Sequence, residues 1–449
     1  MADDTRKQKR ERRKRREQRE RAMAYRQHPD NAPREPATPE PPPFDDTIDI
    51  QGLKFFDKLV PLLKPLHKAN TQRDSARNRK LHFDQYALLM LLYLFNPVVS
   101  SLRSLQQASQ LDKVQRRLGV KRTSLGALSE AASSVFDAEL LKPIIADLAS
   151  QVRPLAKDPQ LQDIQHTVTL VDGSLISALP AMAEASFLHH TTGKGTVKWR
   201  LHTHFDVERY VPERIDVTRD GGGELDERAV MEKNVEKDRC YVMDRGFAKF
   251  KLFNEINTAD SSYVCRLRDN SNYEVIQENE LSDAARKARV TQDATVQIGQ
   301  TGKAESRPDH TIRLVIIEKK AHTKFRSGGK SGAACDGYLR LATNLLDVPA
   351  EIIALLYEYR WTIEIFFRFF KQILGCRHLI SHSENGITIQ TYCAIIACLL
   401  MSLWTGRKPT KRTYEMICFY FMGLASEAEL LGHLEKLKRS DEEQRKRAQ

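Results

Sequence analysis

The sequence predicts a mixed α/β protein in which a strand-rich stretch separates two helical ones. Three observations predict this fold class. Leucine recurs at helical spacing between about residues 50 and 148, short β-branched runs follow from residue 166, and strongly apolar helical patterns return at residue 347. With 449 residues, the chain can bury one large core or several smaller ones.

The first 45 residues are predicted to form a basic arm and a linker. Residues 6–21 include 11 Lys or Arg and few apolar residues, too few to offset the entropy lost on folding. We expect a disordered arm; the alternative is a solvated charged helix, because Glu11, Glu17 and Glu20 can support one. Six prolines between residues 31 and 44 favour an extended linker.

Composition limits the partners and the location of the protein. The net charge of +12 favours a polyanionic partner. The longest apolar run, about 392–404, is shorter than the roughly 20 residues of a membrane span, and no apolar stretch follows the charged start. We therefore expect no membrane span and no secretory signal. Seven scattered cysteines predict reduced cytosolic thiols without a zinc cage or disulfides.

Residues 46–160 are predicted to form a helical domain. Its short amphipathic helices are broken at Gly119. Basic residues surround the break: Arg103, Lys113, Arg116, Arg117, Lys121 and Arg122. A helix-turn-helix with a basic rim and an ordinary helical bundle with a basic surface both fit this pattern.

Two of the strands predicted after residue 166 end at an aspartate. One run ends in Asp172-Gly-Ser and the other in Asp244-Arg-Gly. An acid at a strand end is held by the sheet but stays open to solvent, and neighbouring carboxylates repel each other unless a divalent cation lies between them. The alternative is that each Asp only forms a turn. Further strand-like runs predict a β-rich block between residues 254 and 346.

Helices are predicted again from residue 347. Asp347 is the expected N-cap of the first helix, with Pro349 in its first turn. The second helix, about 386–404, is apolar nearly all round and is expected to be buried. An amphipathic helix with a charged end is expected to follow.

Four polar residues share one face of the first of these helices. At about 100° per residue, Tyr357, Arg360, Glu364 and Lys371 fall within a stripe about 60° wide. The helix is otherwise mainly aromatic and apolar, so this charged ridge costs desolvation unless it faces a functional cleft. The alternative is an ordinary surface pair between Arg360 and Glu364.

This spacing, preceded by LATNL (341–345) and by the acids in VDGS (171–174) and MDRGF (243–247), resembles the DDE transposases of bacterial insertion sequences, in particular the insertion-sequence-four family. The resemblance covers about residues 172–404. It implies a metal-binding catalytic triad of Asp172, Asp244 and Glu364, with Tyr357, Arg360, Lys371 and Arg245 in contact with DNA phosphates.

The resemblance also implies a domain order. A ribonuclease H-like core in two parts, 161–253 and 347–405, is interrupted by a β-rich insertion at 254–346. The helical domain at 46–160 binds the ends of the DNA element, and a helical segment with a charged tail occupies 406–449. Family members that form DNA hairpins have a Trp in the insertion, yet Trp199, Trp361 and Trp404 lie outside it. Tyr338 is the nearest aromatic residue there, either as a base-stacking group or as a buried strand residue.

The expected activity is DNA transposition. Two Mg²⁺ ions per site, about 3.5 to 4 Å apart, would be held by the triad and would stabilise the attacking and leaving oxygens at phosphorus; Mn²⁺ is a possible substitute. The expected partners are double-stranded DNA, as element ends and as target, and a second copy of the chain in the paired-end complex. The expected location is the cytoplasm of a prokaryote, at the nucleoid.

Two other functions remain open at this stage. One is a catalytically silent DNA-binding protein derived from a transposase, and the other is a simple metal-dependent nuclease. A dense set of histidines also invites a zinc interpretation: His189, His190, His202 and His204. We favour sheet-surface or DNA-facing roles for them, since no cysteine is near. The DGGGE turn lacks the Lys and Ser or Thr of a phosphate-binding loop, so no nucleotide cofactor is expected.

Overall fold

A computed structural model describes most of the chain, which divides into two units, Met1–Asp49 and Ile50–Gln449. The described residues are 13–18, 20, 60–69, 79–154, 159–162, 164–177, 198–219, 221–299, 307–319, 337–375, 380–381 and 383–448. In the first unit, residues 13–18 are helical. Exposed ion pairs join Arg13 Nε to Glu17 Oε1 at 3.0 Å and Arg16 Nε to Glu20 Oε1 at 2.9 Å. Over these residues the arm matches the charged-helix alternative.

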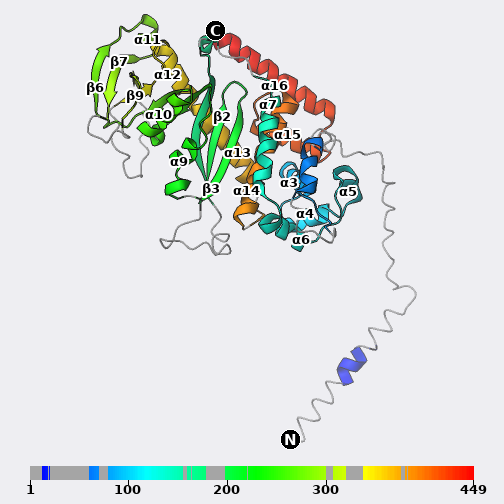
Figure 1. Ribbon diagram of the computed structural model, residues 1–449. Helices are drawn as coiled ribbons and strands as arrows, with labels where there is room; N and C mark the ends of the chain where they lie inside the picture. The colour runs from blue at the N-terminus through cyan, green and yellow to red at the C-terminus, as the bar shows by residue number, and fades with distance from the viewer. Residues whose placement is uncertain are drawn as a thin grey trace. The chain divides into compact units, whose positions relative to one another are not determined.

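The second unit begins with the predicted helical region (Figure 1). Its elements are α2 (Val60–Leu63), η3 (Lys64–Lys68), α3 (Phe83–Phe95), α4 (Leu102–Ala108), α5 (Asp112–Leu118), α6 (Leu125–Glu130), η5 (Ala131–Val135), η6 (Ala138–Leu141), α7 (Lys142–Gln151) and η7 (Pro159–Leu161). α3 is almost wholly buried, as its apolar sequence requires. The predicted break at Gly119 is confirmed, because this residue ends α5 in a left-handed conformation (φ 62°) that favours glycine.

The nine strands of the described chain form one mixed sheet. The strands are β1 (Thr167–Ser177), β2 (Lys198–Asp206), β3 (Val211–Arg219), β4 (Arg239–Met243), β5 (Ser262–Arg266), β6 (Tyr273–Glu278), β7 (Val290–Ile298), β8 (Ile312–Glu318) and β9 (Tyr338–Thr343). Their order is β3-β2-β1-β4-β5-β9-β8-β7-β6. β1, β4 and β5 are parallel neighbours, and every other pair is antiparallel. The expected strands of the β-rich block are thus present, and its first strand, β5, continues the parallel part of the sheet.

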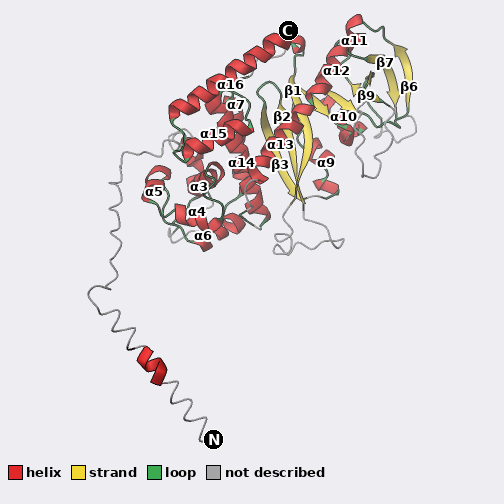
Figure 2. Ribbon diagram, turned by 180° about the vertical axis from the view of Figure 1, so that it is seen from behind, coloured by secondary structure: helices red, strands yellow, loops and turns green. Residues whose placement is uncertain are grey.

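Helices follow or interrupt these strands (Figure 2). They are η8 (Gly223–Leu225), α9 (Glu227–Glu232), η9 (Arg245–Phe247), α10 (Phe250–Thr258), α11 (Asp283–Lys287), α12 (Ala350–Tyr359), α13 (Trp361–Gly375), α14 (Glu384–Thr405), α15 (Lys411–Phe421) and α16 (Glu427–Ala448). The mixed α/β class predicted from the sequence is confirmed.

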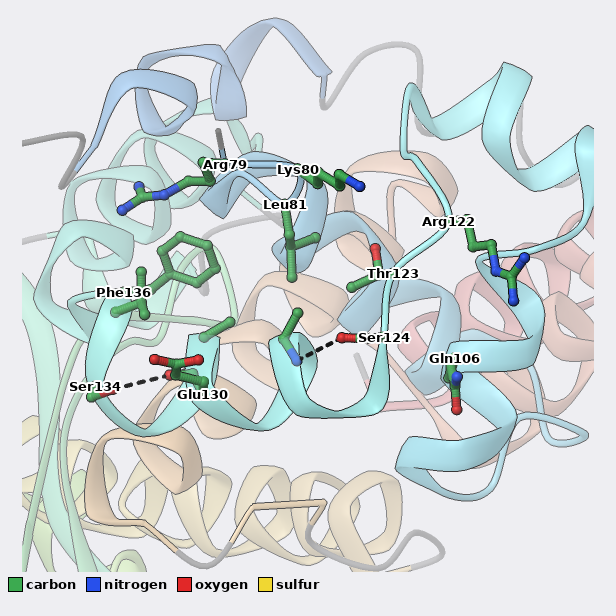
Figure 3. A pocket seen from close by; sticks show the side chains of 13 residues that line it. Arg79, Lys80, Leu81, Gln106, Arg122, Thr123, Ser124, Glu130, Ser134 and Phe136 are labelled. Carbon is green, nitrogen blue, oxygen red and sulfur yellow. Dashed lines mark hydrogen bonds between the residues drawn. The ribbon is translucent and has the colours of Figure 1, made fainter. Parts of the chain in front are cut away.

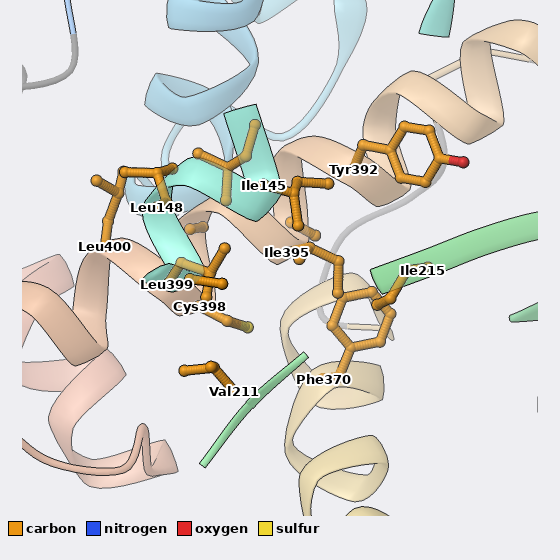
Figure 4. Packing of buried hydrophobic residues seen from close by; sticks show 14 of the residues in the cluster. Ile145, Leu148, Val211, Ile215, Phe370, Tyr392, Ile395, Cys398, Leu399 and Leu400 are labelled. Atoms are coloured by element: carbon orange, nitrogen blue, oxygen red, sulfur yellow. The ribbon is translucent and has the colours of Figure 1, made fainter. Parts of the chain in front are cut away.

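The core lies on both faces of the sheet because successive strand residues point to opposite sides. Val168 and Leu170 of β1 join the larger cluster, whereas Val171 joins the smaller one beside α10. Figure 4 shows α7, β3, α13 and α14 meeting in the larger cluster. α14 therefore ties the helical region to the sheet.

α14 is longer than the apolar run suggested. It has 22 residues and contains an 18-residue window with a mean hydropathy of 1.8, so by length and composition it is the one helix in the described chain that could cross a membrane. However, 94% of that window is buried inside the protein, as expected for a core helix. The prediction of a buried apolar helix is confirmed, and the apolar run noted in the sequence, about 392–404, covers only part of this helix.

Candidate functional site

The two predicted acids lie side by side on neighbouring strands. β1 and β4 pair in parallel, and their last partners are Val171 and Met243. Asp172 and Asp244 are the next residues along each chain. By strand alternation, both carboxylates point to the same face as Leu170 and Val242, the face that carries the larger core cluster.

One detail of the prediction is wrong for Asp172. Asp244 directly follows β4, as expected, but Asp172 lies inside β1, which continues to Ser177. The reason is that β2 pairs with the far half of β1, where Asp172 lies opposite Thr203. On the side of β4, however, Asp172 has no strand partner, because that pairing ends at Val171 and Met243.

A helix pair supplies the other predicted residues. The expected single helix is interrupted at Arg360, which lies between α12 and α13 and bonds Tyr357 O at 3.1 Å in a tightened turn. Its backbone stays helical (φ −52°, ψ −33°), so the predicted stripe survives the break. Tyr357 therefore comes from α12 and Glu364 from α13.

Contacts of this helix pair join both strand acids. Arg360 Nη2 lies 2.6 Å from Glu364 Oε1, and Arg360 Nη1 lies 3.8 Å from Asp172 Oδ2. The hydroxyl of Tyr357 donates to Asp244 Oδ1 at 3.3 Å. The structure thus brings together five of the seven predicted site residues. The surface-pair alternative for Arg360 and Glu364 fails, because only 16% of the Arg360 side chain is exposed and this arginine also reaches Asp172.

The environment of Asp172 changes the pKa of its carboxyl group. Burial raises its pKa to about 6, although the positive charge of Arg360 and a hydrogen bond from Gly173 N at 2.8 Å oppose the shift. The negative charges of Glu364 and Asp244 add to the increase. Three carboxylates therefore interact in a half-buried place, a pattern common at functional sites.

Lys371 and Arg245 lie outside this contact network. Both side chains are exposed, and among the described residues no hydrogen bond or ion pair joins either side chain to the other five residues. Lys371 is on α13, seven residues beyond Glu364, and Arg245 begins η9 directly after Asp244. Their predicted phosphate contacts depend on DNA that reaches beyond the carboxylates.

The donor set suits a hard divalent cation. Carboxylate oxygens are the ligands that Mg²⁺ prefers, and mutual repulsion of the acids favours a cation between them. Within the described ranges, no three acidic, His or Cys side chains converge closely enough to enclose a metal ion as they stand. Arg360 lies between Asp172 and Glu364 instead, so a guanidinium provides the positive charge there.

Of the four histidines considered for zinc, only His202 and His204 lie in the described part of the chain. For these two, the expected place on the sheet surface or facing DNA is wrong. His202 and His204 are buried: Thr218 Oγ1 lies 2.8 Å from His202 Nε2, and the His204 ring packs edge-on against Tyr241 of β4. Burial lowers their pKa values to about 4 and about 3, so both are neutral at pH 7. His189 and His190 lie outside the described residues.

Tyr338 is the first residue of β9, whereas the buried residues of this strand are its last three. Its side chain is 38% exposed, so the alternative of a buried strand residue is wrong.

Five cysteines in the described chain, at 240, 265, 393, 398 and 418, are free and buried.

A fourth carboxylate next to the site was not foreseen. Glu227 of α9 pairs with Arg200 of β2 and lies so close to Gly173 that a Cβ there would overlap its carboxylate. Glu227 also approaches Gly246. The signal in the sequence was Gly173, directly after Asp172, because a residue without a Cβ leaves room for a group that comes close.

The start of α12 differs from the prediction. The helix begins at Ala350 with Pro349 as its N-cap, so the expected N-cap role of Asp347 is wrong. Arg313 of β8 explains this. Its Nη1 donates to the carbonyls of Leu345, Leu346 and Val348 at 3.1, 3.0 and 2.5 Å, which holds this link curved around the guanidinium before the helix begins.

The other end of that link is anchored to the sheet. Asn344 Oδ1 accepts from Tyr263 N at 3.0 Å, and Asn344 Nδ2 donates to Ser261 O and to Asn257 Oδ1, each at 3.0 Å. The LATNL motif that contains Asn344 was noted in the sequence, but only the structure gives its contacts.

Comparison with known proteins gives consistent matches. Residues 163–400 match the family described as "Transposase DDE domain". A transposase of Sinorhizobium fredii, y4zB, is 25% identical over 205 residues, which are 45% of this chain and 52% of the relative. A transposase for the insertion sequence element IS5377 of Geobacillus stearothermophilus is 28% identical over 240 residues, 51% of this chain and 58% of the relative.

A transposase for the element IS4SA of Synechocystis is 29% identical over 170 residues, 36% of this chain and 40% of the relative. The chain thus spans about half the length of the curated relatives that it matches. Among solved structures, a piggyBac transposase synaptic complex with hairpin DNA aligns over 86% of this chain and 82% of its own, at 12% identity and a TM-score of 0.37, too low to support an argument. The matched segment contains all three predicted acids.

Proposed function

Since the chain belongs to the transposase DDE domain family, we propose that it is a DNA transposase that binds the ends of its insertion sequence, cleaves the backbone and joins the 3′-hydroxyl ends to target DNA. One observation carries this proposal: Tyr357 and Arg360 connect both strand acids with the helix pair that also carries Glu364. Tyr357 contacts Asp244, and Arg360 contacts both Asp172 and Glu364. The resulting group of three carboxylates, a guanidinium and a phenol suits phosphoryl transfer.

We propose a ribonuclease H-like core, supported by the strand order. In the order β3-β2-β1-β4-β5, with an antiparallel hairpin side and a parallel side, Asp172 lies in the central strand β1 and Asp244 directly follows its neighbour β4. The predicted insertion adds β6 to β9 beside β5 and returns the chain to α12. Because β5 takes part in this core order, the proposed insertion begins after Arg266 and not at residue 254, whereas the other boundaries stay as predicted from the sequence.

We propose Asp172, Asp244 and Glu364 as the ligands of two Mg²⁺ ions. When bound, these ions supply positive charge to the attacking and leaving oxygens at phosphorus. In this proposal Arg360 then exchanges its contacts with Asp172 and Glu364 for a contact with a DNA phosphate. Its Nε is buried without a hydrogen-bond partner among the described residues, so this guanidinium has a donor in reserve for a phosphate oxygen.

Other residues of the chain orient the DNA. The Tyr357 ring lies 5.7 Å from the Arg360 guanidinium, which limits the directions in which that side chain can point. Tyr357 also holds Asp244 in place by its hydroxyl. Lys371 and Arg245, both exposed, suit contacts to phosphates away from the scissile bond.

The decisive experiment incubates the purified full chain with Mg²⁺ and a plasmid that carries the flanking DNA of the element. The proposal predicts cuts at the element ends and joined products. Cutting without preference for the ends would support the simple nuclease instead. Specific binding without any cutting would support the catalytically silent DNA-binding protein, an alternative that the presence of all three acids disfavours.

We propose that the active species is a homodimer on paired ends, in the prokaryotic cytoplasm. Joining two ends in one event requires two active sites held together. The C-terminal helices provide a candidate surface, because Phe419, Leu424 and Leu431 are 45%, 72% and 53% exposed. Other residues of α15, including Tyr420 and Phe421, are buried and do not add to this surface.

Deleting residues 1–45 is expected to weaken DNA binding and to flatten its salt dependence, because the arm releases counterions from phosphates. The effect should be nearly the same for all DNA sequences. Titrating end DNA and unrelated DNA at several salt concentrations measures both quantities. Loss of sequence preference with an unchanged salt slope would contradict this and make the arm a base reader.

Replacing Lys371 with Ala is expected to impair the paired-end complex and to lower the rate several-fold, since this residue is about 10 Å along the helix from Glu364. Metal occupancy, measured by Fe²⁺-directed backbone cleavage, should not change. Arg368→Ala, an exposed charge on the same helix, is the matched control. A Lys371 variant that loses metal but still pairs ends would instead make Lys371 part of the metal site.

A further inference from the structure

A large open hollow lies in the helical region, away from the carboxylates (Figure 3). It has a volume of about 670 Å³ and lies between the segment before α3 and the turn formed by α6 and η5. Nothing in the family match covers it, because the matched segment begins at residue 163. Its lining is mixed in a way that suggests a ligand.

Cations approach the hollow from two segments distant in sequence. Arg79 and Lys80 lie on one side, and Arg122, about 40 residues later, lies on the other, as Figure 3 shows. Glu130 is the single acid in the lining. Lys80 and Arg122 are exposed, and within the described ranges no ion pair neutralises either of them.

Apolar groups and hydroxyls line the space between these cations. Leu81 and Phe136 are buried in it, and Phe136 is held by stacking on Phe83 with ring centroids 4.7 Å apart. Ser124 and Ser134 bring hydroxyl groups to the same hollow. A cationic rim around apolar and hydroxyl surface matches a sugar-phosphate chain, whose charges flank less polar deoxyribose.

The walls are fixed before any ligand arrives. η5 is a π-helical turn, a feature often found at functional sites. Asn385 of α14 holds it, donating from Nδ2 to Ala132 O at 2.8 Å and to Phe136 O at 2.6 Å, while its Oδ1 accepts from Ala138 N at 3.2 Å. Thr123 N is held by Ser109 Oγ at 3.2 Å on the other side. A preformed hollow loses less entropy on binding.

The surrounding surface extends the positive charge beyond the hollow. Between residues 102 and 124 the chain carries six Lys or Arg and one Asp. Arg103, Arg116 and Lys121 are exposed there. A compact anion would need cations that converge on one point, whereas charges spread over two rims and the adjoining surface fit an extended polyanion.

We infer that this hollow binds the sugar-phosphate backbone of duplex DNA, with Lys80 and Arg122 contacting phosphates on its two sides. This deepens the proposed function by naming where the helical region holds the element's end. The contacts fix the position of the DNA and carry no sequence information themselves. Base reading would then come from neighbouring elements.

The test measures binding of the full chain to a duplex of the element's end at several salt concentrations, for Lys80→Ala, Arg122→Ala and the double variant. Each lost phosphate contact should reduce the log-log salt slope by about 0.9, and the double variant by about 1.8. Affinity at moderate salt should fall on the order of tenfold in the double variant. Unrelated duplexes should lose the same factor.

Lys287→Ala is the matched control, since Lys287 is exposed on α11 in the β-rich block. The inference is overturned if the double variant keeps the slope and affinity of this control. It is also overturned if affinity falls with an unchanged slope, because lost packing would explain that. The assay uses no metal and no cleavage, so a chain that cuts element ends but fails this test contradicts only the inference. A chain that binds no DNA contradicts the proposed function itself.

Discussion

Replacing Asp172, Asp244 or Glu364 with the matching amide, Asn or Gln, is expected to abolish cleavage and joining while end binding persists. Each amide keeps the shape of the side chain but removes the negative charge that holds a divalent cation. The rate should fall by at least about 10² to 10³, the loss typical when one stabilising group is removed from a reacting centre. Plasmid cleavage and gel-shift titration measure the two effects separately.

Glu358→Gln is the matched control for these variants. Glu358 is exposed on α12, one residue beyond Tyr357, so the same chemical change occurs on the same helix pair away from the carboxylates. Its rate should stay close to that of the unmodified chain. Mg²⁺-dependent cutting retained in any one of the three amide variants would remove that residue from the catalytic set.

Replacing Arg313 with Met is expected to cause the largest loss of stability. Arg313 is 6% exposed and Asp293 3% exposed, and Arg313 Nε and Nη2 bond the two Asp293 oxygens at 2.8 and 2.7 Å. Removing one partner of a buried pair costs about 3 to 5 kcal/mol, because the other charge remains buried. The link to α12 also loses the donor for three of its carbonyl groups. Urea unfolding measures the loss.

Arg286→Met tests whether this effect belongs to the buried pair. Arg286 pairs with Asp283 in the same β-rich block, but these side chains are 62% and 91% exposed. Such a pair contributes less than about 1 kcal/mol. Equal shifts of the urea midpoint in the two variants would show that Arg313 does not stabilise the start of α12 in the way described.

Local patterns in the sequence predicted the elements well. Strand alternation and helical periodicity are set by neighbours in the chain, so β1, β4 and α13 appeared near their expected places. The shared face of Tyr357, Arg360 and Glu364 was also predicted correctly. The turn at Arg360 has helical backbone angles, so these side chains keep the spacing of a continuous helix. The contacts of Tyr357 with Asp244 and of Arg360 with Asp172 place this face next to both strand acids.

The errors came from distant contacts that a linear pattern does not contain. Asp172 lies inside a strand because β2, more than 25 residues later, extends the pairing of β1. Asp347 is not the N-cap because Arg313 in another strand binds the carbonyls before α12. His204 is buried because Tyr241 of β4, a strand that follows later in the chain, packs against its ring.

Fe²⁺-directed backbone cleavage of the full chain tests the central claim most directly, because it maps the residues around a bound divalent cation without requiring catalysis. The account predicts cuts next to Asp172, Asp244 and Glu364 that Mg²⁺ suppresses by competition. The same cuts should disappear in the triple variant Asp172→Asn, Asp244→Asn, Glu364→Gln. Cuts that persist in this variant, or that fall elsewhere in the chain, would contradict the assignment of these three carboxylates as the metal site.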